Sequence, residues 1–396
     1  MKIIDIQEIK VPLEETHRIS NAIINFAQHT TSLVAVYSDT IRNGRRVIGY
    51  AFNAMGRFAQ GDILRDRMIP RVLSAQPESL LREGRTEFDP AKVLKAAMRQ
   101  EKPGGHGDRA SAAGALELAI WDLNSKLLDE PAYANIARAY GRTLTSQATA
   151  TYATGGFYWA PGDGMSMTLT DELRRYRDKG YTAFKIKIGG APIATDLKRL
   201  EEALAVAGSP ERLAVDVNCR FDLETGAQWI EALAPYRLRW LEEFGDPLDY
   251  DINARMVARY GERVATGENL FSAVDVKNLV RFGGMRPGKD VFQMEPALSY
   301  GLTEYACMID IMEAHGFSRT QAYPHGGHAL NMHVAIGLQL GGTESLPFDG
   351  MFQPFMGFTS DCVVKDGIVE AGDSPGFGLE AKLELRPWLK QLDTLH

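Results

Sequence analysis

The sequence is poor in cysteine and has no long apolar run. Three cysteines occur in 396 residues, at the widely separated positions Cys219, Cys307 and Cys362. An odd, scattered set argues against a disulfide framework, so we expect reduced thiols in a reducing compartment. No apolar run reaches the length of a membrane span, and the first residues lack the basic-then-apolar pattern of a secretory signal. We therefore expect a cytoplasmic protein that does not contact a membrane.

The chain also lacks an excess of basic residues. Its formal net charge is −7, which provides no basic face for nucleic acid. The same charge does not attract an anionic substrate, so any such attraction must be local to a site. Charged residues at 24% and hydrophobic residues at 45% are ordinary for a globular protein, and the length is sufficient for two domains.

Residues 183–190 have the alternation of a strand that carries two lysines on one face. Lys185 and Lys187 point the same way, because successive side chains of a strand alternate between faces. Two neighbouring ammonium groups should lower each other's pKa, and a lysine tuned in this way can act as a general base. Taken alone, the pattern favours an edge strand with its lysines in water.

Five more strand-like runs follow at intervals of about 26 to 30 residues, the length of a strand, a helix and two loops. Each run ends in a charged side chain: Asp216, Glu242, Glu268, Glu295 and His325. Helical stretches are expected between them, at about 193–208, 224–236, 249–260, 272–282, 301–315 and 327–340. Repeated units of this kind predict a parallel barrel, whose functional residues lie at the carboxyl ends of its strands.

Three acids on three consecutive strands need a common counter-ion. A single carboxylate at such a place is usually a helix N-cap, but Asp216, Glu242 and Glu268 would meet at the rim of one barrel. Hard oxygen ligands without competing sulfur suit Mg²⁺ better than zinc or copper. The sequence therefore predicts a magnesium site formed by these three residues.

The order Lys-x-Lys, Asp, Glu, Glu and His resembles the mandelate racemase branch of the enolase superfamily. This resemblance implies an α/β fold, a (β/α)7β TIM-like barrel with an N-terminal α+β capping domain. Residues 1–125 would form the cap, completed by the C-terminal residues from about 361 to 396, and residues 126–360 would form the barrel. Shorter segments resemble the D-tartrate dehydratases: 101–106, 187–192, 245–250, 265–272, 297–301 and 324–328.

The cap has its own pattern of elements. Alternation predicts strands at 3–11, 31–37 and 46–52, followed by helices at about 61–75 and 90–99. In the superfamily two cap loops, here about 16–29 and 52–61, close over the barrel mouth. The resemblance implies substrate contacts from Asn21, Asn53 and Lys102, with Lys102 binding a carboxylate, whereas Arg57 is treated as an ordinary loop residue.

The resemblance also implies the roles of the barrel residues. Mg²⁺ and Lys185 would stabilise an enediolate after Lys187 removes the α-proton of a 2-hydroxy acid. His325 would bind the substrate and protonate the departing β-hydroxyl, and Glu295, in place of the usual Asp, would fix the tautomer of His325. Glu344 would contact a substrate hydroxyl or hold a neighbouring base. His328 is interpreted as a cap or packing residue, one turn into the following helix.

Several functions fit this set of residues. The first is an acid-sugar dehydratase, a carbon–oxygen lyase that most simply converts D-tartrate to oxaloacetate and water. A racemase or epimerase with the same two bases, a dehydratase of another acid sugar, and a non-catalytic homologue remain open. Whether a tyrosine contacts the substrate, and whether it is Tyr152 or Tyr158, is also left open. The partners that we expect are a small acid sugar and further copies of the chain.

Overall fold

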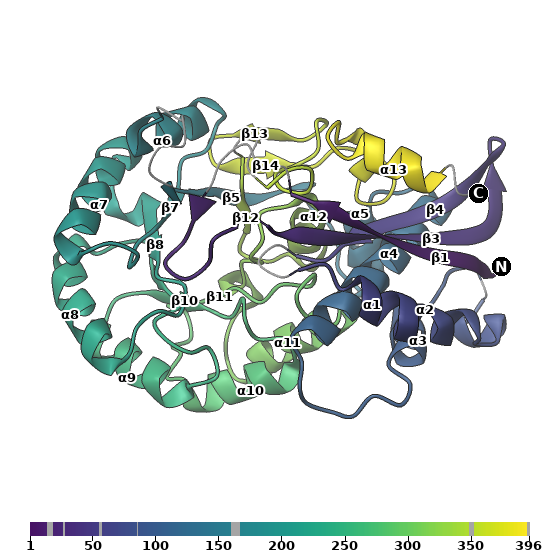
Figure 1. Cartoon of the computed structure of the whole chain (residues 1–396), viewed down its shortest axis with the longest axis horizontal. Helices are drawn as coiled ribbons and strands as arrows, with labels where there is room; N and C mark the ends of the chain where they lie inside the picture. Colours follow the sequence, from purple (N-terminus) through teal and green to yellow (C-terminus); the bar gives the residue numbers. More distant parts are fainter. Residues whose placement is uncertain are drawn as a thin grey trace.

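The computed structural model describes residues 1–13, 19–26, 28–54, 58–84, 86–159, 167–347 and 352–393. Figure 1 shows two parts, a ring of helices around a barrel of strands and a cap that contains both ends of the chain. Within the described residues, no helix is both long and apolar enough to cross a membrane.

The cap is built on an antiparallel sheet in the order β1-β3-β4: β1 (Ile3–Pro12), β3 (Thr30–Arg42) and β4 (Arg45–Phe52). Asn43 and Gly44, with φ of 49° and 75°, form the tight turn between β3 and β4. The long helix α4 (Asp108–Leu128) covers this sheet. Gly49 permits the close approach, because a Cβ there would lie 2.1 Å from the carbonyl oxygen of Ala119.

The remaining cap helices match the expected ranges, with one irregularity. The stretch expected at 61–75 is interrupted by a π-helical turn: α1 (Gly61–Ile63), η1 (Leu64–Met68) and α2 (Ile69–Leu73). A 3-10 turn, η2 (Pro77–Leu80), leads to α3 (Pro90–Ala97). Asp89 caps α3 by accepting a hydrogen bond from the Lys92 amide.

The barrel strands are parallel and short. They are β5 (Ala148–Gly155), β7 (Phe184–Lys187), β8 (Leu213–Asp216), β9 (Leu241–Glu242), β10 (Val264–Thr266), β11 (Val291–Phe292) and β12 (Thr343–Ser345). Lys187 pairs with Asp216, and Asp216 pairs with Glu242, so their side chains emerge at one level of the rim.

The seventh position of the barrel is not the regular strand that was expected at 320–325. Residues 319–321 form a 3-10 turn, η5 (Arg319–Gln321), and Ala322 makes a single parallel bridge to Phe292. Ser318 and Gln321 cap this turn reciprocally, which favours it over an extended strand. The ring still closes, because Tyr323 N donates to Phe292 O and Gly341 N donates to Ala322 O.

Helices alternate with these strands and complete the (β/α)7β order, which confirms the predicted fold. They are α6 (Leu169–Asp178), α7 (Ile193–Ala207), α8 (Leu223–Leu233), α9 (Tyr250–Tyr260), α10 (Ala273–Phe282), α11 (Leu302–Ala314) and α12 (Ala329–Leu338). Two 3-10 turns, η3 (Pro210–Arg212) and η4 (Ala234–Tyr236), precede β8 and follow α8. The helix α5 (Ala132–Ala139) packs on α12.

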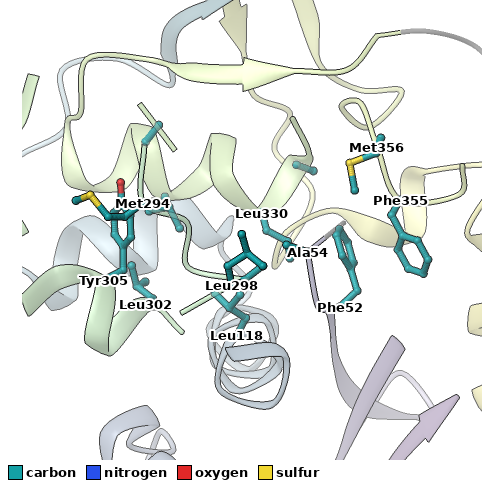
Figure 2. Packing of buried hydrophobic residues seen from close by; sticks show 14 of the residues in the cluster. Phe52, Ala54, Leu118, Met294, Leu298, Leu302, Tyr305, Leu330, Phe355 and Met356 are labelled. Carbon is teal, nitrogen blue, oxygen red and sulfur yellow. The ribbon is translucent and has the colours of Figure 1, made fainter. Parts of the chain in front are cut away.

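Cap and barrel share one apolar core. Figure 2 shows Leu118 of α4 next to Leu298, and Phe52 of β4 next to Phe355. A second link lies at the barrel mouth, where β2 (Ile19–Ser20) pairs with β6 (Tyr158–Trp159), which follows the first barrel strand. This pairing holds part of the first predicted cap loop over the carboxyl ends of the strands.

The C-terminal residues contact both parts. The hairpin β13 (Val363–Lys365) and β14 (Ile368–Glu370) pairs with β5 of the barrel. After the turn η6 (Leu379–Ala381), α13 (Arg386–Asp393) lies against the cap, where Tyr37 Oη donates to Leu392 O at 3.0 Å. The predicted division of the chain at 125/126, which falls within α4, stays a prediction.

Candidate active site

Two lysines of β7 are buried inside the barrel. Lys185 Nζ lies 2.5 Å from Glu242 Oε1 and 3.1 Å from Glu344 Oε1. Lys187 Nζ makes an ion pair with the carboxylate of Asp216. Lys185 is 0% exposed and Lys187 4% exposed, which excludes the interpretation of β7 as an edge strand with lysines in water.

Asp216, Glu242 and Glu268 form the carboxylate cluster. Each offers an oxygen within 4.8 Å of the others. Asn218 N holds Asp216 Oδ1 at 2.8 Å, and the Trp240 and Gln293 side chains hold Glu242 Oε2, each at 2.8 Å. These bonds orient the carboxylates while leaving the cluster rich in negative charge. A set of hard oxygens fits a divalent cation such as Mg²⁺.

The lysine pKa values correct one expectation. Burial lowers the pKa of Lys187, and Lys185 lowers it too, but the charges of Asp216, Glu268 and Glu242 raise it above its ordinary value. For Lys185, burial also lowers the pKa, yet the charges of Glu242 and Glu344 raise it well above the ordinary value. The mutual effect of the two lysines is therefore smaller than the effect of the carboxylates beside them.

His325 stands between two carboxylates. Its Nδ1 is 2.8 Å from Glu295 Oε2, and its Nε2 is 3.1 Å from Glu268 Oε2. Burial lowers the pKa of His325, but the charges of Glu268 and Glu344 and the hydrogen bond to Glu295 raise it to about 10. The neighbouring carboxylates thus favour the protonated imidazole, and Glu295 reaches Nδ1 with a side chain one methylene longer than the Asp usual at this position.

Glu344 connects the two sides of the rim. Its carboxylate accepts hydrogen bonds from the Thr154 hydroxyl and, at 2.9 Å, from Gly326 N. It also lies 3.1 Å from Lys185 Nζ and 3.9 Å from His325 Nε2. The sequence analysis gave Glu344 two possible roles, to contact a substrate hydroxyl or to hold a neighbouring base. Its contacts with Lys185 and His325 agree with the second role.

A cavity of about 250 Å³ opens beside the carboxylate cluster. Lys187, His325, Glu268 and Glu344 line it from the barrel. Apolar side chains supply much of the remaining wall: Ile23, Ile24, Phe26, Phe157, Leu298 and Leu346. The predicted base and the predicted acid therefore face the same space.

Two acceptor groups in the cavity wall were missed by the sequence reasoning. Asn218 Oδ1 and Glu243 Oε2 are buried and have no hydrogen-bond donor among the described residues. Asn269 Nδ2 holds the other oxygen of Glu243 at 2.8 Å. Burial, then the charges of Glu268 and Asp216, raise the pKa of Glu243 well above its ordinary value. The only sequence signal was their position, two residues after Asp216 and one residue after Glu242.

The family follows from a match to residues 168–385, more than half of the chain, by a model described as enolase C-terminal domain-like. The chain belongs to this family. A 3,6-anhydro-alpha-L-galactonate cycloisomerase of Streptomyces coelicolor is 28% identical, over 71% of this chain and 72% of its own. An arabinonate dehydratase of Saccharolobus solfataricus is 24% identical, over 84% of this chain and 85% of its own. The predicted membership of the enolase superfamily is confirmed.

Solved structures have the same fold as this enolase-superfamily chain. A Streptomyces coelicolor racemase with bound magnesium has a TM-score of 0.74 at 22% identity, covering 95% of this chain and 96% of its own. An L-talarate dehydratase from Polaromonas sp. JS666, complexed with Mg and L-glucarate, has a TM-score of 0.73 at 20% identity, covering 97% and 95%. At these identities the likeness extends to the barrel and its cap.

Of the predicted cap contacts, only Asn21 lines the cavity of this superfamily member. Its Oδ1 accepts from the amides of Ile23 and Ile24 at 2.8 and 2.7 Å, so the amide nitrogen is the group left for a ligand. Asn53 is fully buried in the cap, where its Oδ1 accepts from Ser32 N at 2.5 Å. Arg57 lies outside the described residues.

Lys102 is placed away from the barrel mouth, which corrects its predicted role. The residue is exposed and lines a different cavity, of about 640 Å³, between α3 and the loop 101–106. Arg109 Nη1 donates to the Lys102 carbonyl at 2.8 Å and helps to fix the loop there. The sequence could not show the conformation of this loop, and so it could not show that the Lys102 side chain is exposed to solvent.

Neither candidate tyrosine lines the cavity. Tyr152 is buried inside the barrel against Trp240, with ring centroids 5.1 Å apart. Tyr158 Oη donates to Asp196 Oδ2 at 2.8 Å. Phe157, from the same segment, lines the cavity instead, together with Phe26 of the cap side.

Proposed function

We propose that this enolase-superfamily protein is a Mg²⁺-dependent dehydratase of acid sugars. The observation that carries the proposal is that Lys187 and His325 line one cavity beside the carboxylate cluster. Magnesium bound to this cluster would supply positive charge for the substrate carboxylate and replace the ammonium groups as the counter-charge of Asp216 and Glu242. Relatives named as dehydratases of sugar acids support the reaction type.

Lys187 is proposed to remove the α-proton. Its Nζ lies at the cavity and is otherwise paired with Asp216. Once that carboxylate has another counter-charge, the burial of Lys187 and the nearby charge of Lys185 favour its neutral form, which can accept a proton. Lys185 keeps its ion pair with Glu344 and stabilises the negative charge that develops on the substrate.

His325 is proposed to complete the elimination as a general acid. It gives the Nε2 proton to the β-hydroxyl, the carbon–oxygen bond breaks, and water leaves. The electron pair from the α-carbon forms the new double bond, and the resulting enol becomes a 2-keto acid. Glu295 holds the Nδ1 side of the imidazole throughout this step, at 2.8 Å.

The wall chemistry bears on the choice of acid sugar. The resemblance to D-tartrate dehydratases makes D-tartrate a candidate substrate. Its second carboxylate would need a cationic side chain in the cavity wall as a partner. In the described wall, the cationic groups are Lys187 and His325, both already assigned to the reaction. Asn218 Oδ1 offers an acceptor, and Glu243, whose raised pKa favours the protonated carboxyl, offers a second polar group; both match substrate hydroxyls. An acid with further hydroxyls is therefore a candidate substrate beside D-tartrate.

A substrate screen tests the proposal. The protein with Mg²⁺ would be incubated in D₂O with D-tartrate and a set of aldonic and aldaric acids. Keto-acid formation would be read as semicarbazone absorbance and α-deuterium incorporation by NMR. We expect keto acid from at least one sugar acid and none after exhaustive chelation. Deuterium exchange with inversion and no keto acid would show a racemase or epimerase instead. No exchange and no keto acid from any compound would contradict the proposal.

A further inference from the structure

Glu295 uses both of its carboxylate oxygens on histidines. Oε2 is 2.8 Å from His325 Nδ1, and Oε1 is 2.8 Å from His328 Nε2. Glu295 and His328 are both 0% exposed, and neither lines the cavity. The three side chains thus form a buried row of which only His325 reaches the substrate space. The function outlined above uses Glu295 and His325 but gives no role to His328.

His328 is fixed in place by elements other than the row itself. It occupies the N-cap position of α12, not a position one turn into the helix. The ring of Phe52, from the cap strand β4, meets it edge-on with centroids 5.1 Å apart. Phe52 is packed in turn on Phe355, at 4.7 Å, and Figure 2 shows these two rings side by side. His328 therefore cannot easily follow a movement of Glu295.

The hydrogen bond to Glu295 defines the chemical state of His328. A carboxylate accepts, so Nε2 of His328 carries the proton. The other ring nitrogen, Nδ1, finds no hydrogen-bond partner among the described residues. Asn331 of α12 provides a second contact between this helix and His325, because its Nδ2 donates a hydrogen bond to the His325 carbonyl. The backbone and the carboxylate partner of His325 are thus both held from α12.

The space around the Glu295 carboxylate leaves it little freedom. Gly326 has φ of +106°, and a Cβ at this position would lie only 2.5 Å from Glu295 Oε1. The loop between His325 and His328 therefore passes directly over the carboxylate. A glutamate has one more rotatable bond than an aspartate, so without such constraints it would hold an imidazole less firmly.

We infer that His328 is a positioning residue for the acid step. By holding Oε1 of Glu295, it directs Oε2 onto His325 Nδ1 and so aims the His325 Nε2 proton into the cavity. This inference rests on the proposed dehydratase function, and it assigns His328 to the loss of the hydroxyl and not to removal of the α-proton. Lys187 also lines the cavity, but it makes no hydrogen bond or ion pair with these three residues; its ion-pair partner is Asp216.

The deciding comparison is His328→Leu against His328→Gln. Leucine removes the donor, whereas the amide nitrogen of glutamine can take the place of Nε2 and still donate to Glu295. We expect His328→Leu to slow keto-acid formation by about 10- to 100-fold, the usual effect of losing a partner of this kind. Exchange of the α-proton with deuterium should persist, so the ratio of exchange to elimination should rise by the same factor. His328→Gln should restore most of the wild-type ratio.

A matched control separates positioning from general destabilisation. His333 is another buried histidine of α12, with Nδ1 accepting from Tyr133 N at 3.2 Å, and it does not contact Glu295. His333→Leu should lower the melting temperature but leave the ratio of exchange to elimination unchanged. An equal loss of exchange and elimination in His328→Leu, or a failure of His328→Gln to restore the ratio, would overturn the inference.

A readout without substrate keeps the inference separate from the proposed function. The His325 Nδ1 proton bonded to Glu295 should give a downfield resonance in proton NMR, assigned by its absence in His325→Asn. It should be retained in His328→Gln and His333→Leu and lost or shifted in His328→Leu. An unchanged resonance in His328→Leu would overturn the inference. If the wild type turned over no sugar acid, the proposed function would fail, and this resonance would still decide whether His328 positions His325.

Discussion

The floor of the cavity and its cap side are built on different principles. The floor consists of ionisable side chains at the carboxyl ends of successive barrel strands, and it contains ion pairs such as those of Lys185 with Glu242 and Glu344. The cap side offers mainly apolar groups such as Ile24 and Phe26, from a loop that pairs with the barrel lip. The floor thus gathers the ionisable groups assigned to the proposed reaction, whereas the cap side is mainly apolar.

The largest effect is expected from the base on the floor. Lys187→Ala should reduce keto-acid formation by about 100- to 10,000-fold, the contribution typical of a general base. It should also abolish α-deuterium exchange, because no other described base faces that proton from the same side. Steady-state rates and NMR exchange would measure this. Lys365→Ala, at a surface position in β13, serves as the control, and retention of exchange in Lys187→Ala would contradict the assignment.

The carboxylate cluster should show the next largest effect. Asp216→Asn and Glu268→Gln each remove one negative charge from the proposed ligand set, so Mg²⁺ affinity should fall by about 10- to 100-fold or more. Isothermal titration with Mg²⁺ would measure the affinity, and circular dichroism would check the fold. Asp251→Asn, on the exposed face of α9, provides a charge-matched control. Unchanged Mg²⁺ binding in both site variants would place the metal elsewhere.

Two cap substitutions test the other half of the comparison. Phe26→Ala removes an aromatic ring of the cavity wall that packs edge-on against Phe157, also in the wall, and against Phe352 behind it, with centroids 5.9 and 4.9 Å apart. We expect KM to rise by about 10-fold, as for the loss of about 1.4 kcal/mol of contact, with a smaller change in kcat. Lys102→Ala should change neither parameter, even for D-tartrate. If Lys102→Ala lost activity on diacids but not on monoacids, the original prediction that Lys102 binds a substrate carboxylate would be supported.

The last prediction concerns the stability of the framework behind the floor and not the rate of the reaction. Burial lowers the pKa of His333 from 6.5 to about 4, so the folded state favours its neutral form. This stabilisation is fully present above pH 6.5 and is lost as the pH falls towards 4, an upper limit of about 3 kcal/mol. Urea unfolding of the metal-free protein between pH 4 and 7 would measure it. His333→Asn keeps an acceptor for Tyr133 N without titrating there, so its stability should depend less on pH. If the free energy of unfolding depended on pH in the same way in the wild type and in His333→Asn, the prediction would be contradicted.

The sequence by itself determined the barrel and its charged floor. Strand ends recur at a nearly constant interval, and parallel strands bring their carboxyl ends to one rim, so Asp216, Glu242 and Glu268 had to meet. The same regularity located Lys187 and His325 without knowledge of any contact between them. Local signals also gave most helix bounds, because a glycine such as Gly208 or Gly261 follows directly where the helix ends.

Only the tertiary structure decided which cap residues reach the cavity and what surrounds His325. Asn53 and Lys102 have the chemistry of ligands, but β4 buries the first and the loop before α4 exposes the second. Glu243, Asn218 and His328 gave no periodic signal, because their roles depend on atoms that approach from other elements. Loops lack a fixed repeat of side-chain direction, so the contacts of their residues are set by how cap and barrel pack together and cannot be counted from the sequence.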